Sequence, residues 1–429
     1  MPYDVAEVRR YFPALLEGAA HFDGPGGSQV PTPVAAAVAG TLSSAVANRG
    51  RITRAERRAD DIVHGARLAV ADLLDGDPGG VVFGRSMTQL TFDVSRTLAR
   101  TWRPGDEIVV TRLDHDANIR PWVQAARGAG AGVRWAEFDP RTGELPLDAV
   151  TELLTPNTRL VAVTGASNLL GTRPDVPAIA GAAHRVGALV YVDAVHLAPH
   201  APVSRAELGA DFVVCSPYKF FGPHLGALAA DPALLETLRP DKLLSSTDEV
   251  PERFELGTLP YELLAGTTAA IDFIAGLGGM DDEPSDRRGY PQPRIHAATG
   301  RRSRLIDAMR VVEEYEGELF ARVLAGLEQI PGVRMHGGPL RRTPTVLFSV
   351  DGLAPAYVHQ QLAAVGVNAP AGSFYALEAS RRLGLGDDGA VRVGLAPYTD
   401  ASDVDRLLDA LDRLVASGRS LPGAVRNQP

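Results

Sequence analysis

The chain has 429 residues, of which 45% are hydrophobic, and its formal net charge at pH 7 is -9. This length and composition predict two or three globular units, and an acidic chain without a basic run argues against a nucleic-acid partner. The longest apolar runs are shorter than the roughly 20 residues that span a bilayer, and residues 1–13 lack an apolar signal core. We therefore expect a cytoplasmic protein with no membrane partner.

Two helices are expected at 32–48 and 54–76, and from about residue 81 short apolar runs alternate with helical patterns. Runs of Val, Ile and Leu without alternating polarity are typical of strands buried on both faces, which predicts a mostly parallel sheet covered by helices. The apolar runs lie at 81–84, 106–113, 132–139, 158–167, 188–196, 211–216 and 226–231, and the helical patterns between them lie at 86–101, 118–130, 145–155 and 175–187.

The chain changes character after about residue 276. A polar, Pro- and Gly-containing segment near 280–300 is interpreted as an exposed insertion or linker. A long helix at 303–329, a strand near 343–352, a helix at 354–366, a strand near 390–397 and a final amphipathic helix at 400–418 then predict a smaller α/β domain. We expect a large domain at 21–275 and a small domain formed by 1–20 and 276–429.

Two residue counts restrict the chemistry. Cys215 is the single cysteine, which excludes an internal disulfide and a cysteine-based metal cage, and we predict no metal site. Lys219 and Lys242 are the only lysines, and every other basic residue among the 43 Lys and Arg is arginine. Arginine keeps its proton, whereas a desolvated lysine amine can lose it and attack a carbonyl. Lys219, in "SPYKFFGP", is therefore a candidate for imine chemistry, and its alternative interpretation is an ordinary surface lysine.

Polar side chains follow the predicted strands where each strand ends. In open α/β sheets, ligands bind outside the carboxyl ends of the strands, so we expect these residues to share one site. They are Arg85, Ser86, Met87, Thr88 and Gln89, then Asp114, His115, Asp116, Ala117 and Asn118, and then Asn168, Asp193, His196, Ser216 and Lys219.

These residue types match the needs of pyridoxal 5'-phosphate (PLP). A lysine holds its aldehyde as an imine, a carboxylate keeps its ring nitrogen protonated, and a helix N-terminus binds its phosphate. Nicotinamide is a weaker alternative, because no G-x-G-x-x-G follows the first strand and no G-x-x-x-x-G-K-[ST] occurs in the chain.

From "HFDGPGG" at residue 21 to "PYTDASDVDRLL" at 397, the chain resembles the class V aminotransferases and, among them, the cysteine desulfurase and selenocysteine lyase branch. The resemblance implies PLP as cofactor and an α/β fold of the PLP-dependent transferase type I, with a large domain built on a mostly parallel seven-stranded sheet and a smaller α/β domain. It also implies a homodimer and a small amino-acid substrate.

The resemblance also assigns roles to single residues. It makes Lys219 the Schiff-base lysine, Asp193 the partner of the ring nitrogen and His115 the group that stacks on the ring. It places Asn168 and His196 near the phenolic oxygen, gives Arg392 the substrate carboxylate, and has Thr258 reach the phosphate of the partner subunit. Its phosphate-binding residues are Met87, Thr88, Ser216 and Tyr218.

Simpler interpretations exist for several of these residues. Asp193 fits a strand-end cap, Met87 fits core packing, and His115 fits a loop histidine. Arg392 alternates with apolar neighbours and fits the solvent side of a strand. Cys215 lies in a buried-looking run and is interpreted as a small core residue.

The chain departs from the desulfurase pattern at one position. Tyr375, in "VGVNAPAGSFYALE", stands where the desulfurases carry their nucleophilic cysteine, and a phenol accepts no sulfur. We therefore expect C–S cleavage by β-elimination from cysteine or an S-substituted cysteine, with Lys219 as the base at the α-carbon. Aminotransferase and amino-acid epimerase activity with the same cofactor are the alternatives, together with a catalytically silent PLP-binding protein.

Overall fold

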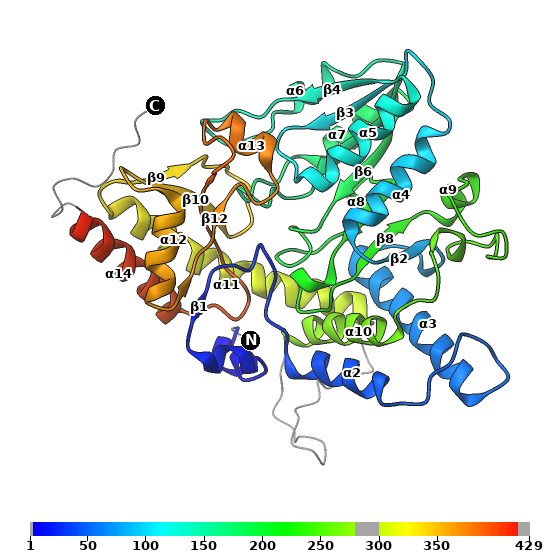
Figure 1. The fold of residues 1–429 in the computed structure, drawn as a ribbon, viewed down its shortest axis with the longest axis horizontal. Helices are drawn as coiled ribbons and strands as arrows, with labels where there is room; N and C mark the ends of the chain where they lie inside the picture. The colour runs from blue at the N-terminus through cyan, green and yellow to red at the C-terminus, as the bar shows by residue number, and fades with distance from the viewer. Residues whose placement is uncertain (1–2, 279–299, 419–429) are drawn as a thin grey trace.

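The computed structural model describes residues 3–278 and 300–418, and its largest feature is a seven-stranded sheet (Figure 1). The strand order is β2-β8-β7-β6-β5-β3-β4, with β8 antiparallel to β2 and β7 and the other pairs parallel. This confirms the predicted α/β class and the mostly parallel seven-stranded sheet. The strands are β2 (Val81–Gly84), β3 (Glu107–Thr111), β4 (Gly132–Ala136), β5 (Thr158–Thr164), β6 (Leu189–Asp193), β7 (Phe212–Cys215) and β8 (Gly226–Ala230).

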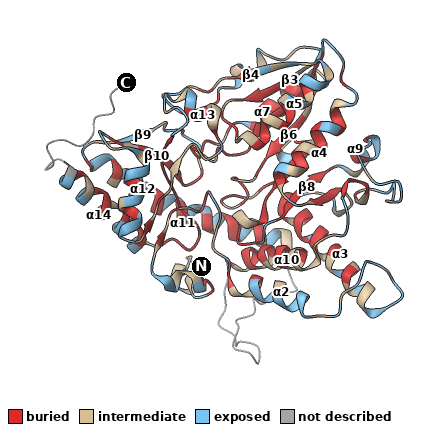
Figure 2. Cartoon of the chain, in the orientation of Figure 1, coloured by how far each residue is buried: buried red, intermediate tan, exposed pale blue. Residues whose placement is uncertain are grey.

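Both faces of this sheet are buried, as the unbroken apolar runs predicted (Figure 2). Along β6, Val190 and Val192 belong to one hydrophobic core, whereas Tyr191 between them belongs to a second core on the opposite face. The first core includes residues of α3 (Arg54–Leu74) and α7 (Val176–Arg185), and the second includes residues of α4 (Met87–Ala99) and α5 (Arg120–Ala129). Alternation along a strand therefore assigns each side chain to one helical layer.

The C-terminal part of the chain forms a second sheet of four antiparallel strands, in the order β12-β13-β10-β9. A two-stranded parallel sheet pairs β1 with β11. The elements are β1 (Ala20–His21), β9 (Val333–His336), β10 (Thr345–Val350), β11 (Val367–Asn368), β12 (Ala371–Gly372), β13 (Ala390–Gly394), α12 (Pro355–Ala364), α13 (Leu377–Arg382) and α14 (Ala401–Gly418). Val346, Phe348, Val391 and Val393 join residues of α12 and α14 in a third core.

The helix α11 (Arg301–Gln329) contributes to two of these cores. Leu305 and Val312 pack in the first core of the large sheet, whereas Leu319 and Val323 pack in the third core. The N-terminal helix α1 (Val5–Arg9) also supplies a residue, Val8, to the first core. The division of the chain into 21–275 and 1–20 with 276–429 stays a proposal.

Several elements differ in extent from the sequence-based expectation. The helix expected at 32–48 is α2 (Thr32–Leu42), and α10 (Tyr261–Gly276), which packs against α2, α3 and α11, was not predicted. The remaining short helices are α6 (Leu147–Thr151), α8 (Arg205–Leu208) and α9 (Pro232–Thr237). Of the insertion predicted near 280–300, residues 280–299 lie outside the described residues.

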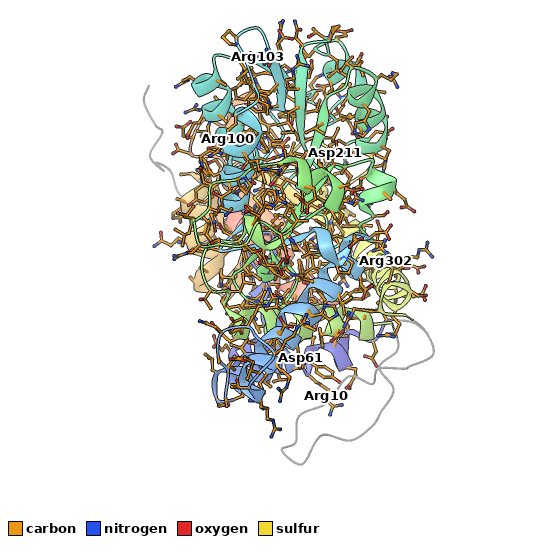
Figure 3. All side chains as sticks on the ribbon, turned by 90° about the vertical axis from the view of Figure 1, so that its right-hand side faces the viewer. Arg10, Asp61, Arg100, Arg103, Asp211 and Arg302 are labelled. Carbon is orange, nitrogen blue, oxygen red and sulfur yellow. The ribbon has the colours of Figure 1, made fainter. Side chains whose placement is uncertain are left out.

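Charged side chains lie mainly on the outside of the molecule, where Arg10, Asp61 and Arg103 are exposed (Figure 3). Among the helices that the structure describes, none is both long and apolar enough to cross a bilayer.

Candidate active site

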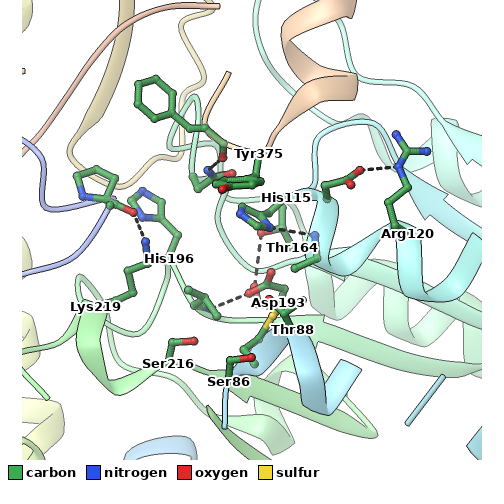
Figure 4. A pocket seen from close by; sticks show the side chains of 18 of the residues that line it. Ser86, Thr88, His115, Arg120, Thr164, Asp193, His196, Ser216, Lys219 and Tyr375 are labelled. Atoms are coloured by element: carbon green, nitrogen blue, oxygen red, sulfur yellow. Dashed lines mark hydrogen bonds and ion pairs between the residues drawn. The ribbon is translucent and has the colours of Figure 1, made fainter. Parts of the chain in front are cut away.

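A cavity of about 620 Å³ opens at the carboxyl ends of the central strands (Figure 4). Its volume lies in the range of small-molecule binding sites. Most of the residues predicted from the sequence line it, whereas Thr258 and the strand-end residues Arg85, Gln89, Asp114 and Asn118 do not. The predicted residues in its wall are Met87, Thr88, His115, Asn168, Asp193, His196, Ser216, Tyr218, Lys219, Tyr375 and Arg392. Residues up to 305 positions apart in the sequence, from Met87 to Arg392, thus border one cavity, as the strand ends and the resemblance predicted for most of them.

Lys219 lies in the turn of 3-10 helix Pro217–Lys219 that follows β7. Its Nζ donates a hydrogen bond to the backbone oxygen of Pro25 and lies 4.9 Å from the centre of the Tyr218 ring. Burial lowers the pKa of Lys219 to about 7, and the charge of Arg392 lowers it further, against the opposing effect of Asp193. A large share of this amine is therefore neutral, and so nucleophilic, near neutral pH.

Asp193 is the last residue of β6 and is 3% exposed. Its Oδ1 accepts a hydrogen bond of 2.9 Å from the backbone N–H of Val195, so the side chain also makes the strand-end contact of the simpler interpretation. Burial raises the pKa of Asp193 to about 6, while that N–H and the charge of Lys219 act in the opposite direction. A buried carboxylate of this kind is suited to pair with a cationic ring nitrogen.

His115 follows β3 as the N-cap of the 3-10 turn Asp116–Asn118, and its Nδ1 accepts a hydrogen bond of 3.0 Å from the N–H of Ala117. Burial, together with the charges of Lys219 and Arg392, lowers the pKa of His115 to about 4, so its ring is neutral at pH 7. The ring of Tyr375 lies 5.6 Å from it, tilted by 35°. A neutral, flat ring at the wall of the cavity is suited to stack on an aromatic ligand.

The start of α4 forms one end of the cavity. Ser86 is the N-cap and accepts a hydrogen bond of 3.1 Å from the N–H of Gln89, and Met87 and Thr88 lie in the first turn. The first N–H groups of a helix have no partner inside it and attract anions. β8 approaches this helix start closely: a Cβ on Gly226 would lie 2.2 Å from the backbone carbon of Ser86. Glycine at position 226 is therefore required for this end of the site.

Three buried polar atoms in the cavity wall have neither a hydrogen-bond nor an ion-pair partner among the described residues: Asn168 Oδ1, His196 Nδ1 and Arg392 Nε. In two of these side chains the other polar atom is bonded: Asn168 Nδ2 donates to the Phe374 backbone oxygen at 2.9 Å, and His196 Nε2 lies 3.0 Å from Thr345 Oγ1. Burial lowers the pKa of His196 well below its usual value. Since unsatisfied buried polar groups are costly, three in one wall indicate a polar ligand.

Arg392 lies in the middle of β13 and is 2% exposed, so the interpretation that it lies on the solvent side of a strand is wrong. Its Nη1 donates to the backbone oxygen of Asn168 at 2.8 Å, and its guanidinium carbon lies 3.8 Å from the centre of the Phe374 ring. Burial lowers the pKa of Arg392 to about 9. A buried guanidinium with a free edge is suited to bind a carboxylate.

Cys215 lies outside this wall. It is the last residue of β7, is 0% exposed and packs in the first core. Burial and the charge of Asp193 raise its pKa to about 12. Tyr375 does line the cavity, with its side chain 78% exposed. Within the described residues, the cavity wall therefore contains no thiol.

Other residues of the wall were not among the predicted site residues. Thr164 ends β5 and pairs with Asp193 across the strands, so the strand-end argument should have included it. Phe374 precedes Tyr375 in the same loop, but an aromatic loop residue resembles core packing in the sequence. Pro25 contributes its backbone oxygen, for which the sequence contains no side-chain signal.

The profile of the family Aminotransferase class-V matches residues 20–289 and 304–407. The uncharacterized protein MT3887 of Mycobacterium tuberculosis (strain CDC 1551 / Oshkosh) is 36% identical over 419 residues, covering 96% of this chain and 100% of that protein. A probable cysteine desulfurase of Pseudomonas aeruginosa is 32% identical over 423 residues, covering 94% and 97%. The crystal structure of the Escherichia coli cysteine desulfurase CsdA aligns with a TM-score of 0.83 at 26% identity, covering 97% of this chain and 100% of that one. The chain therefore belongs to the class V aminotransferase family, in its cysteine desulfurase-like branch, and is an enzyme.

Proposed function

We propose that this enzyme is a PLP-dependent lyase that cleaves the C–S bond of cysteine or an S-substituted cysteine by β-elimination. The observation that carries the proposal is the composition of the cavity wall. It holds a half-buried lysine with a lowered pKa, a buried aspartate and a buried arginine with a free edge, and no thiol among the described residues.

The residues present fit PLP. The start of α4 and Ser216 would hold its phosphate, Asp193 would pair with its ring nitrogen, His115 would stack on its ring, and Lys219 would bind its aldehyde carbon. The buried atoms Asn168 Oδ1 and His196 Nδ1, which lack protein partners among the described residues, are suited to polar atoms at the ring edge. When bound, PLP supplies an electron-accepting ring that stabilises the negative charge left at the substrate α-carbon.

In the elimination, Arg392 and Lys219 have different roles. Arg392 binds the substrate carboxylate, which orients the α-hydrogen. Once the amino group of the substrate has displaced Lys219 from the aldehyde carbon, the neutral amine of Lys219 would take up the α-proton. The bond between the β-carbon and sulfur breaks, and the electron pair leaves with sulfur as a thiolate that is then protonated. With one water consumed, the overall products are a thiol, pyruvate and ammonium.

The absence of a thiol from the described cavity wall favours elimination over sulfur transfer to the enzyme. Sulfur transfer of that kind needs a thiolate beside the substrate, whereas Cys215 is buried in the core with a raised pKa. Tyr375 has a hydroxyl, and a hydroxyl oxygen forms no persulfide. Sulfur is therefore expected to leave the site as free thiol or sulfide.

Product analysis tests the proposal. The purified holoenzyme is incubated with S-methyl-L-cysteine and with L-cysteine, and pyruvate, ammonium, alanine and thiol are quantified by mass spectrometry in parallel with the Cys215→Ala variant. Equal amounts of pyruvate and ammonium, unchanged in Cys215→Ala, support elimination. Alanine with sulfur retained on Cys215 would establish a desulfurase, amino transfer to an added keto acid an aminotransferase, and formation of the D-amino acid an epimerase. No turnover of any amino acid by a PLP-loaded protein would indicate a silent binding protein.

A homodimer is part of the same proposal. Thr258 is exposed and lies outside the cavity of its own chain, as expected of a residue that reaches the phosphate in a partner subunit. The cytoplasmic location expected from the sequence stays a prediction.

A further inference from the structure

Arg392 is a buried cation; burial lowers its pKa, and the charge of Asp23 acts in the opposite direction. Among the residues that the structure describes, no ion pair is seen for it, although it is 2% exposed and lies in the wall of the cavity. A buried charge of this kind is costly unless its hydrogen bonds are satisfied. The hydrogen bonds that the guanidinium makes within the protein therefore show which of its N–H groups are left to bind a ligand.

Each edge of this guanidinium has a different environment. Nη1 is occupied by the backbone oxygen of Asn168 at 2.8 Å. Nε is buried and has no partner in the described part of the chain. Nη2 faces the turn at 23–27, where a Cβ on Gly26 would lie 3.7 Å away, an ordinary van der Waals distance, and no hydrogen bond from Nη2 is seen among the described residues. The edge formed by Nε and Nη2, which carries two parallel N–H groups, is therefore the free one.

The ring of Phe374 covers a face of the same guanidinium. The distance from the guanidinium carbon to the ring centre is 3.8 Å, which is the shortest cation–ring distance among the described residues. A cation over a ring in a site that excludes water is held more strongly than at an exposed site. The ring also covers one face of the guanidinium. The free N–H groups point outward in the plane of the guanidinium, so a carboxylate binds them in that plane.

The position of Phe374 is imposed by contacts outside its own loop. Phe374 and Tyr375 both have positive φ, at 53° and 57°, a conformation that is unfavourable for residues with a side chain. The backbone oxygen of Phe374 accepts a hydrogen bond of 2.9 Å from Asn168 Nδ2, and that of Tyr375 accepts one of 2.7 Å from the N–H of Asp116. Two strained residues held by two bonds to other loops indicate a fixed wall.

The end of this loop is anchored by charge. Glu378, in the first turn of α13, forms ion pairs with Arg112 and Arg120. Arg120 also pairs with Asp116 at 2.7 Å. Two residues that border the cavity, Arg120 and Asp116, thus belong to the ion-pair cluster that anchors the loop carrying Phe374.

We propose that Phe374 is a positioning residue for Arg392: its ring and the Asn168 backbone oxygen together fix the guanidinium so that its Nε–Nη2 edge binds the substrate carboxylate in the plane. This inference rests on the carboxylate role of Arg392 in the proposed function. Asn168 links Arg392 to the Phe374 loop, since its backbone oxygen accepts a hydrogen bond from Arg392 and its side chain donates one to the Phe374 backbone oxygen.

The test uses chemical labelling, which requires no turnover. Phenylglyoxal modifies arginine side chains, and the extent of modification at Arg392 in the holoenzyme is followed by peptide mass spectrometry at increasing concentrations of propanoate, a simple carboxylate. The variants are Phe374→Leu, which removes the ring, and Phe374→Tyr, which keeps it. The matched control is Phe320→Leu, because Phe320 is also a buried ring over an arginine, with Arg342 at 5.0 Å, but lies outside this cavity.

Propanoate is expected to protect Arg392 in the wild type, and Phe374→Leu should raise the concentration for half-protection about tenfold. Phe374→Tyr and Phe320→Leu should stay within about twofold of the wild type, which excludes a general effect of lost packing. Half-protection in Phe374→Leu equal to that of the wild type, or an equal rise in Phe320→Leu, would overturn the inference. A tenfold shift in an enzyme that shows no elimination would reject the lyase proposal alone and leave this inference standing.

Discussion

Asp114 provides a quantitative test of the electrostatics beside the site. This side chain is 0% exposed and lies next to His115 in the loop after β3. Its Oδ1 accepts a hydrogen bond of 2.6 Å from Asn118 Nδ2, and Oδ2 accepts one from Thr111 Oγ1. Burial raises the pKa of Asp114 to about 8, and the nearby charge of Asp193 acts in the same direction. The folded protein therefore keeps this proton at neutral pH.

The sign and size of the effect follow from that pKa. In the unfolded chain the carboxyl loses its proton near its ordinary pKa of 3.8, whereas in the folded chain it does so near 8. Between these values the folded state binds more protons, so stability falls as pH rises from about 4 to about 8. A difference of about four between the two pKa values corresponds to at most about 6 kcal/mol, because each pKa unit is worth about 1.4 kcal/mol.

Asp114→Asn replaces the protonated acid by a neutral group of the same shape and removes this pH-dependent term. Thermal unfolding of the PLP-saturated protein at pH 5 and pH 8.5 measures the effect, with about 1 °C expected per kcal/mol for a chain of this length. The variant should unfold about 2–6 °C higher than the wild type at pH 8.5 and within about 1 °C of it at pH 5. The matched control Asp307→Asn, on an exposed carboxylate of α11, should show no such difference. A lower midpoint for Asp114→Asn at pH 8.5 would refute the assignment of a buried, protonated carboxyl.

Three further predictions concern the cavity and its assembly. Arg392→Lys keeps the charge but loses the two parallel N–H groups, so kcat/KM should fall about 30- to 150-fold, which corresponds to about 2–3 kcal/mol of transition-state stabilisation. An unchanged kcat/KM would remove Arg392 from the site. Burial lowers the pKa of Lys219 to about 7, so the rate of PLP uptake by apoenzyme should rise with pH through a midpoint near 7. Asp193→Asn should move that midpoint to lower pH, because the charge of Asp193 raises the pKa of Lys219. A midpoint near the ordinary lysine value of 10.5 would contradict a desolvated amine. Light scattering of the holoenzyme should give the mass of a dimer, and a stable, fully active monomer would exclude the role proposed for Thr258.

The central sheet could be predicted from the sequence because its signal is local. Each strand is an unbroken run of apolar residues, as in "LVYVD" and "FVVC", and each run ends at a polar residue. Since parallel strands end at the same edge, Asp193 and Lys219 were expected in one site before any contact was known. The structure brings both to the same cavity.

The remainder of the wall depends on contacts that leave no local pattern. Phe374 and Asn168 are 206 positions apart and meet through a backbone oxygen. The burial of Arg392 depends on β12 and β10 lying on both sides of β13, whereas its sequence alternation fits an exposed strand equally well. Helix α10 was missed because its apolar residues extend around much of the helix, so it lacks the one-sided periodicity of a surface helix.

The central claim, that Lys219 is the residue that holds PLP, has a direct test because the chain contains two lysines. Borohydride reduction of the PLP-loaded enzyme makes a lysine–PLP bond permanent, and peptide mass spectrometry then locates it. Lys242 is a natural control, since its Nζ donates to the Ser246 backbone oxygen at 2.9 Å and pairs with Asp248 outside the cavity. We predict one PLP per chain on the peptide containing Lys219, and none in Lys219→Ala. Attachment to Lys242, or an equal yield in Lys219→Ala, would contradict the assignment of the site.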